Sequence, residues 1–273
     1  METLAWIILF CTLSGVLSIV ASAGILVLPD RLRGSVLPHL VSFAIGALLG
    51  AAFLALLPHA LGSPQVTDLH DITLVVLIGI LIFFVLEKLV LWRHCHHSEC
   101  EVHTPEEGHD HAHNHHHHHQ DKTGYAGTLV LFGDGVHNFV DGVLIAAAFL
   151  VDTELGIVTA LAVATHEIPQ EIGDFAVLLS SGFSRKKALM YNLLSSLAMV
   201  VGGVAAYFVL QEVEHLLPYV LAVAAASFIY VAVADLIPSL HKKTELKVSL
   251  QQTALIVLGV VVIYTSHQWM HGG

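Results

Sequence analysis

Side chains that can bind metal ions gather in two consecutive apolar stretches near the middle of the sequence. The first stretch carries His137, Asn138 and Asp141, and Asp134 lies about one helical turn earlier. In a helix, residues three or four positions apart share a face, so an imidazole, an amide oxygen and a carboxylate would converge there. This spacing predicts a metal-binding face on the first stretch.

The second stretch repeats the pattern with more acidic residues. Glu167, Glu171 and Asp174 follow the i, i+4, i+7 spacing of one helix face, and His166 and Gln170 form an adjoining stripe. Two such helices packed together would surround one or two divalent ions. The alternative is that these buried polar groups only hydrogen-bond to one another and join the helices. The predicted metal ligands are His137, Asn138, Asp141, His166, Glu167, Gln170 and Glu171, with Asp134 and Asp174 as pathway or accessory residues.

Pro169 lies inside the second stretch, between the predicted ligands. It lacks the N–H that would bond the carbonyl of Thr165, and its ring crowds that carbonyl. We therefore expect the helix to kink and to free an oxygen at the level of His166. Polar backbone at membrane depth is tolerated where it is buried or lines a wet cavity, which fits an ion path.

The composition is that of a membrane protein. Hydrophobic residues make up 55% of the 273 residues, charged residues 12%, and the mean hydropathy is +0.75. Such a chain is too apolar for a water-soluble globule, and apolar runs of about 20 residues, which is the length that spans a bilayer, recur throughout. Ionisable residues inside the bilayer usually face a partner, a cavity or an ion path. No basic tract indicates a nucleic-acid partner.

We predict an all-α integral membrane protein with one transmembrane domain over residues 1–273, surrounded by the lipid bilayer. The first apolar run follows Glu2 and no basic segment precedes it, which indicates a retained helix and not a signal peptide. The eight predicted helices span about 4–28, 36–61, 72–92, 125–150, 155–181, 186–210, 216–239 and 249–269.

The charges of the connections predict an orientation. All eleven basic residues lie on one set of alternate connections: Arg31, Arg33, Lys88, Arg93, Lys122, Arg185, Lys186, Lys187, Lys242, Lys243 and Lys247. The other connections carry only acids or histidine, such as Asp68, Asp152 and Glu214. By the positive-inside rule the basic connections are cytoplasmic, so both termini would lie outside.

Two helix ends resemble each other at opposite faces. The second helix ends in Leu57-Pro58-His59, and the seventh ends in Asp235-Leu-Ile-Pro238. This similarity suggests an inverted repeat that relates helices one to three to helices six to eight. Small residues such as Gly46 and Gly202 would permit close helix packing.

The connection at residues 93–123 is a His-rich loop, which the charge pattern places in the cytoplasm. Its composition cannot form a core, yet clustered imidazoles suit zinc and similar metals. The three cysteines, Cys11, Cys95 and Cys100, make no disulfide framework. The predicted loop contacts to metal are His94, Cys95, His96, His97, His109, His111, His113, His115, His117 and His119.

The residue types and motifs resemble those of the ZIP (Zrt/Irt-like) family of divalent metal transporters, including its prokaryotic members. Imidazole, carboxylate and amide ligands without thiolates suit Zn²⁺, Fe²⁺, Mn²⁺ or Cd²⁺ better than Cu(I). The resemblance covers nearly the whole chain, and the HNFxDG and HEIPxExGD motifs of helices four and five are its most specific part. His59, Asp235 and His267 match family patterns less specifically and are kept as pathway or accessory residues.

The resemblance implies a 3+2+3 arrangement, with the inverted repeat around helices four and five. It also implies a transport site, often binuclear, and a homodimer. The protein would take up zinc, with iron, manganese or cadmium as other substrates, across the plasma membrane, or the inner membrane of a bacterium. It would not be an enzyme. Many members have a second histidine where this chain has Gln170, so one metal position would be weaker or differently selective.

Three alternatives remain open at this point. An intramembrane zinc metalloprotease is suggested by His166-Glu167, but HExxH needs a second histidine where Gln170 stands. A metal exporter would typically have six helices and a cytosolic carboxyl-terminal domain. A metal buffer or sensor based on the His-rich loop would leave the intramembrane ligands unexplained.

Overall fold

The structure is a computed structural model, and it describes residues 2–95, 122–241 and 245–271. Within these ranges every regular element is a helix and no strand occurs. The all-α prediction is therefore confirmed for the described part of the chain.

The helices follow the predicted ranges to within a few residues at most ends. The second helix begins earlier than predicted, directly after Pro29. The elements are α1 (Glu2–Val27), α2 (Asp30–Ala51), η1 (Ala52–Leu56), α3 (Leu57–Gly62), α4 (Leu69–Cys95), α5 (Lys122–Val151), α6 (Thr153–Ser180), α7 (Arg185–Glu212), η2 (Glu214–Leu216), α8 (Leu217–Tyr230), η3 (Val231–Leu236), α9 (Ile237–Leu240) and α10 (Leu246–His271).

Several helices are long and apolar enough to cross a membrane. Seven stretches among the described residues meet this condition: Glu2–Val27, Arg31–Gly62, Leu69–Leu89, Val130–Val151, Arg185–Glu212, Glu214–Leu240 and Leu246–Trp269. Helix α6 is not among them, and it is the helix that carries the second polar motif. The chain is therefore a multi-pass membrane protein.

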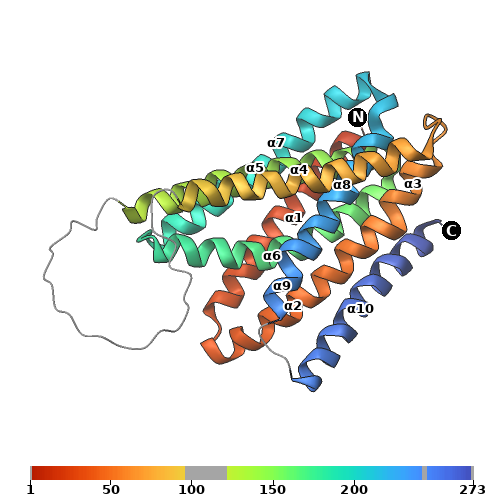
Figure 1. The fold of residues 1–273 in the computed structure, drawn as a ribbon. Helices are drawn as coiled ribbons and strands as arrows, with labels where there is room; N and C mark the ends of the chain where they lie inside the picture. Colours follow the sequence, from red (N-terminus) through yellow and green to blue (C-terminus); the bar gives the residue numbers. More distant parts are fainter. Residues whose placement is uncertain (1, 96–121, 242–244, 272–273) are drawn as a thin grey trace, which may run out of the picture.

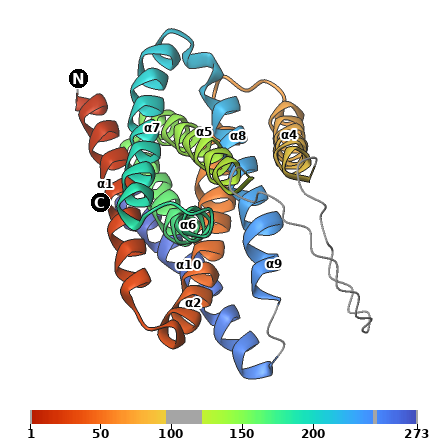
Figure 2. The same cartoon turned by 90° about the vertical axis from the view of Figure 1, so that its left-hand side faces the viewer.

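The helices form a bundle in which sequence-distant elements lie side by side (Figures 1 and 2). Helix α5 packs on α6 and α7, and α1 packs on α6 and α7 from the other side. Helix α2 packs on α10, and α4 packs on α8. Both termini lie at one end of the bundle, opposite the end where α4 finishes and α5 begins (Figure 1).

Glycines bring two helix pairs into backbone contact. A Cβ atom added to Gly142 of α5 would lie 1.9 Å from the Met199 carbonyl oxygen of α7. A Cβ added to Gly46 of α2 would lie 1.9 Å from the Ile256 carbonyl oxygen of α10. Close approach through small residues is a main source of helix association in lipid. The packing role expected for the small residues is confirmed at Gly46, and Gly202 makes the same kind of contact with Phe139 of α5.

Two π-helical turns interrupt the helices, and each directly precedes a proline-containing segment. In η1 the N–H of Leu57 bonds the carbonyl of Ala52, and in η3 the N–H of Ile237 bonds the carbonyl of Ala232. A proline in the next position cannot donate to the preceding turn, and the wider turn accommodates this loss. The two similar sequence motifs therefore share an unusual local structure.

Helix α6 runs from Thr153 to Ser180 with Pro169 inside it. Helix widening thus occurs before Pro58 and Pro238, where it was not expected. The kink at Pro169 stays a prediction.

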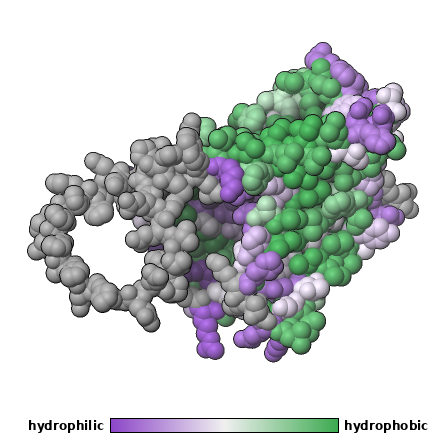
Figure 3. All heavy atoms as spheres, viewed as in Figure 1, coloured by the Kyte–Doolittle hydropathy of each residue, from purple (hydrophilic) through white to green (hydrophobic). Residues whose placement is uncertain are grey.

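The outer surface of the bundle is apolar. Figure 3 shows hydrophobic side chains over much of the visible face, including α4. Leu74, Leu77 and Leu81 of α4 are each more than half exposed. Such a surface suits contact with lipid chains.

Candidate metal site

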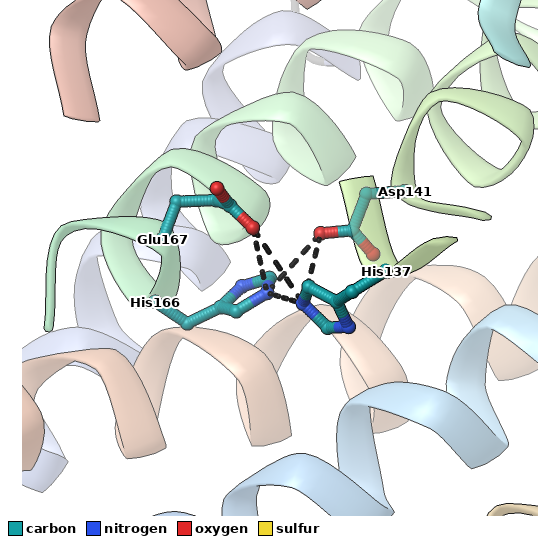
Figure 4. Close-up of side chains that lie close together, drawn as sticks. All are labelled: His137, Asp141, His166 and Glu167. Carbon is teal, nitrogen blue, oxygen red and sulfur yellow. Dashed lines mark hydrogen bonds and ion pairs between the residues drawn. The ribbon is translucent and has the colours of Figure 1, made fainter. Parts of the chain in front are cut away.

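Four side chains from α5 and α6 converge on one point (Figure 4). Helix α5 supplies His137 and Asp141, and α6 supplies His166 and Glu167. The two Nε2 atoms of His137 and His166 lie 3.3 Å apart. The ligand atoms of all four residues lie within 4.8 Å of one another. The predicted convergence of the two motifs is therefore present for these four residues.

The spacing of these atoms fits a tetrahedral metal ion. His166 Nε2 lies 3.2 Å from Asp141 Oδ2, and His137 Nε2 lies 3.5 Å from Glu167 Oε1. The remaining nitrogen–oxygen distances are 3.7 Å for His137–Asp141 and 4.0 Å for His166–Glu167. Four ligands about 2.1 Å from Zn²⁺ at tetrahedral positions are about 3.4 Å apart. The cluster can therefore take a zinc-sized ion with small side-chain shifts.

The deep burial of these polar groups is difficult to explain by helix packing alone. Glu167 is fully buried, and Asp141 and His166 are each 1% exposed. Neither carboxylate oxygen of Glu167 accepts a hydrogen bond from any described residue. A buried carboxylate without hydrogen bonds is unfavourable, and a bound cation would supply the missing partner.

The His166 ring is oriented for ligation. His166 Nδ1 lies 3.2 Å from the carbonyl oxygen of Ala162, one turn earlier in α6. A proton on Nδ1 would be donated to that carbonyl, which leaves Nε2 as the lone-pair atom facing the cluster. The His137 side chain is 24% exposed, so this ligand connects the cluster to its surroundings.

Three predicted ligands stand beside this four-residue cluster. Asn138 is fully buried, and its Nδ2 donates to Asp134 Oδ1 at 2.9 Å. Glu171 is also buried and lies outside the cluster, while Gln170 is partly buried. The two motifs thus provide a mixed nitrogen and oxygen cluster and a neighbouring set of buried oxygens.

Sequence reasoning missed Asn192 of α7. Its Nδ2 donates a short hydrogen bond to Glu171 Oε2, and the residue is 2% exposed. Asn192 Oδ1 and Glu171 Oε1 have no hydrogen-bond partner among the described residues. The signal was available, because Asn192 is a lone amide within the apolar range predicted as the sixth helix.

The accessory residues fall into two groups. Asp174 lies one turn beyond Glu171 in α6, and Asp235 lies in η3. His59 and His267 instead meet each other at the opposite end of the bundle, with ring centroids 5.5 Å apart.

The predicted loop ligands lie outside the described part of the chain. His94 and Cys95 end α4, but their side chains are not described. The others fall within residues 96–121, which are not described: His96, His97, His109, His111, His113, His115, His117 and His119.

A family profile described as ZIP Zinc transporter matches residues 3–266. The chain belongs to the ZIP family. It is 34% identical to Zinc transporter ZIP13 of Pongo abelii over 239 residues, which cover 83% of this chain and 66% of the relative. It is 30% identical to Zinc transporter ZIP13 of Mus musculus over 248 residues, covering 83% of this chain and 69% of the relative.

A shorter match joins the chain to Zinc transporter ZIP10 of Homo sapiens, with 44% identity over 112 residues. That match covers 41% of this chain and 14% of ZIP10. The chain therefore spans about two thirds of the ZIP13 relative and a small part of ZIP10. These relatives are animal proteins, so the likeness is not confined to prokaryotic members. The ZIP family is one of transporters and not of enzymes, in agreement with the prediction.

Proposed function

We propose that this ZIP protein takes up divalent metal, mainly zinc, from the exterior into the cytosol through the site between α5 and α6. The observation that carries the proposal is the buried cluster of His137, Asp141, His166 and Glu167. The names of the ZIP13 and ZIP10 relatives, all zinc transporters, support zinc as the substrate. Iron, manganese and cadmium suit the same ligand types.

We propose eight membrane crossings: the seven apolar stretches and, in addition, α6. Its length of 28 residues is sufficient, and its polar residues face α5 and not lipid. The 3+2+3 arrangement is supported by paired contacts. If α1, α2 and α4 correspond to α7, α8 and α10, the contact of α2 with α10 matches the contact of α8 with α4. The contact of α1 with α6 likewise matches the contact of α7 with α5. The matching π-helical turns η1 and η3 support the same inverted repeat.

Access to the cluster is asymmetric, which supports an inward-facing state. Toward the termini, α5 continues through residues 144–149, which are apolar and at most 3% exposed. Toward the other end, Asp174 is partly exposed and Asp235 is exposed. Figure 3 shows polar side chains in a hollow at this end. Arg185 and Lys187 lie at the same end, so the positive-inside rule makes it cytosolic.

We propose a second, weaker metal position built from oxygen atoms. Asn138 Oδ1 and Glu171 Oε1 are buried acceptors without a hydrogen bond from any described residue. Asn192 Oδ1 is a third such atom. Amide and carboxylate oxygens hold zinc less tightly than imidazole, so an ion here would leave more readily. Gln170 would modulate this position from its partly buried place on α6.

The remaining features of the proposal concern the whole protein. We propose that it acts as a homodimer in the plasma membrane, or in the inner membrane of a bacterium, with both termini outside. We also propose that residues 93–123 of the single transmembrane domain form a cytoplasmic loop that accepts metal through its histidines.

Reconstituted vesicles loaded with a zinc-sensitive dye test the function. The parent protein should give a zinc-dependent signal, and the double variant His137→Ala/His166→Ala should reduce it to the level of empty vesicles. His241→Ala is the matched control, because His241 is an exposed histidine outside the cluster. The proposal fails if the parent gives no signal or if the double variant transports normally. Loading the metal inside and the dye outside distinguishes uptake from efflux.

A further inference from the structure

A second group of metal-ligating side chains lies at the end of the bundle that carries the termini. His59 comes from α3, His267 from α10, and Asp152 from the junction of α5 and α6. His59 Nε2 lies 3.9 Å from Asp152 Oδ2. The rings of His59 and His267 meet edge to face, with centroids 5.5 Å apart. His59 thus contacts an imidazole from one chain segment and a carboxylate from another.

The orientation of His59 is fixed by the π-helical turn before it. His59 Nδ1 lies 2.8 Å from the carbonyl oxygen of Ala55 in η1. A proton on Nδ1 would be donated to this carbonyl, so Nε2 is the lone-pair atom that faces Asp152. A backbone carbonyl that fixes the tautomer in this way is typical of histidines that bind metals.

The two oxygens of Asp152 have separate roles. Oδ1 accepts a hydrogen bond from the N–H of Glu154 at 2.9 Å and caps the start of α6. Oδ2 is the atom directed to His59. The cap therefore holds the carboxylate at its position beside His59.

A cavity of about 400 Å³ reaches His59. His59 lines it together with the polar side chains of Gln65 and Glu214, and with Leu150 and Leu217 on its apolar side. The side chains of His59 and Asp152 are 22% and 31% exposed, so a hydrated cation has access to both.

This group is separate from the α5–α6 cluster. Asp141 and Asp152 are eleven positions apart along the chain, and a helix rises about 1.5 Å per residue, which gives about 16 Å. Ile145 and Ala148, buried apolar residues of α5, lie between them. One ion cannot contact both groups.

We propose that His59, His267 and Asp152 form a second divalent-metal site, which captures zinc-class cations at the outer mouth before they enter the transport site. Two imidazoles and one carboxylate, with the fourth position open to the cavity, are a ligand set of exchangeable zinc sites. A simple ion pair would need one histidine, whereas here a second ring, from another helix, packs against the histidine that faces the carboxylate. The role in capture rests on the proposed function, but metal binding at this group does not.

Anomalous scattering from crystals of the full chain soaked with Cd²⁺ tests the site directly. We expect a peak bounded by His59, Asp152 and His267. Asp152→Asn is the decisive variant, because asparagine also caps a helix but lacks the negative charge. It should lower the peak at half-saturating Cd²⁺, while His70→Ala, an exposed histidine near the α4 start paired with Asp68, should not.

Absence of a peak at this group at saturating Cd²⁺ overturns the proposal, whatever is found at His137 and His166. An unchanged peak in Asp152→Asn also overturns it. A peak here in a protein that does not transport supports the site and contradicts the proposed function instead, so the two failures are distinguishable.

Uptake kinetics test the capture role. His59→Ala and His267→Ala should each raise the KM for zinc about tenfold or more, because loss of even an indirect partner of a metal site reduces affinity by about that factor. The maximal rate should stay close to the parent value, since the transport site is intact. A lowered maximal rate with unchanged KM would show a structural role and refute capture.

Discussion

Glu167 is the residue whose environment is hardest to explain without a cation. It is fully buried, and neither carboxylate oxygen accepts a hydrogen bond from the described residues. His137 Nε2, at 3.5 Å from Glu167 Oε1, is its nearer imidazole contact in the cluster. Without a cation, this desolvated carboxyl group weakens the fold, whereas a bound cation would compensate its charge.

The variant Glu167→Gln separates these two effects. The metal-free protein should unfold at the same temperature as the parent or higher, because a neutral amide replaces a buried carboxyl group that accepts no hydrogen bond from the described residues. Zinc affinity should fall at least about tenfold, which corresponds to about 1.4 kcal/mol. Thermal unfolding in detergent with and without zinc measures both. A large loss of metal-free stability with an unchanged zinc response would contradict the assignment.

Asn192 holds Glu171 from a third helix. Its amide donates to Glu171 Oε2 and thereby turns its own Oδ1 toward the interior. Loss of the amide leaves the buried carboxylate without its donor, and partners of metal ligands typically contribute about 10- to 100-fold to affinity.

We therefore expect Asn192→Leu to reduce zinc uptake at low substrate about tenfold. Asn192→Gln should restore part of the activity, because it keeps the donor. Gln211→Ala, an exposed polar position of the same helix, is the control. Equal activity of the leucine variant and the parent in the vesicle assay would remove Asn192 from the site.

At the scale of helices, glycine contacts set the position of α5 relative to α7. A Cβ atom at Gly142 would lie 1.9 Å from a backbone oxygen of Met199, and a Cβ at Gly202 would lie 2.1 Å from that of Phe139. Asp141 directly precedes Gly142, so separation of the helices would also move a residue of the α5–α6 cluster.

Gly142→Ala and Gly202→Ala should each destabilise the protein by about 1–3 kcal/mol, as overpacking generally does. Gly24→Ala is a matched control, because a Cβ there has no neighbour within 4 Å. It should leave stability unchanged or raise it by up to about 1 kcal/mol through helix propensity. Thermal unfolding of the three variants in one detergent gives the comparison, and equal midpoints would contradict the close packing.

The approximate helix ranges and the convergence of four predicted ligands were predictable from the sequence. Apolar length gave the helix ranges, and periodicity placed His137 with Asp141 on one face. The approach of His59 to Asp152 and of Asn192 to Glu171 was not predictable, because each joins helices whose relative rotation depends on tertiary packing. The π-helical turns were not predicted, because the presence of a proline does not determine whether a helix kinks or forms a wider turn.

At the scale of the whole molecule, the His-rich loop and the transport site are proposed to be separable. The four side chains that converge between α5 and α6 all come from outside the loop. Transport should therefore not require the loop, while its regulation by cytosolic metal should.

Deletion of residues 95–119 should leave basal zinc uptake within about twofold of the parent, since no ligand of the α5–α6 cluster is removed. The response to preloaded cytosolic zinc should change. Vesicle uptake with and without internal zinc measures both quantities. Complete loss of uptake in a normally inserted protein would show that the loop belongs to the pathway.

The π-helical turn η1 absorbs one residue more than a regular helix would hold between α2 and α3. Each residue of a regular helix adds a rotation of about 100°, so without the wider turn this extra residue would rotate His59 away from Asp152. Removal of a single residue from Ala52–Leu56 should therefore return the segment to regular α-helix and leave His59 facing Asp152. A further insertion would instead rotate His59 away from Asp152. Chain length at this end of the bundle would thus tolerate a deletion better than an insertion.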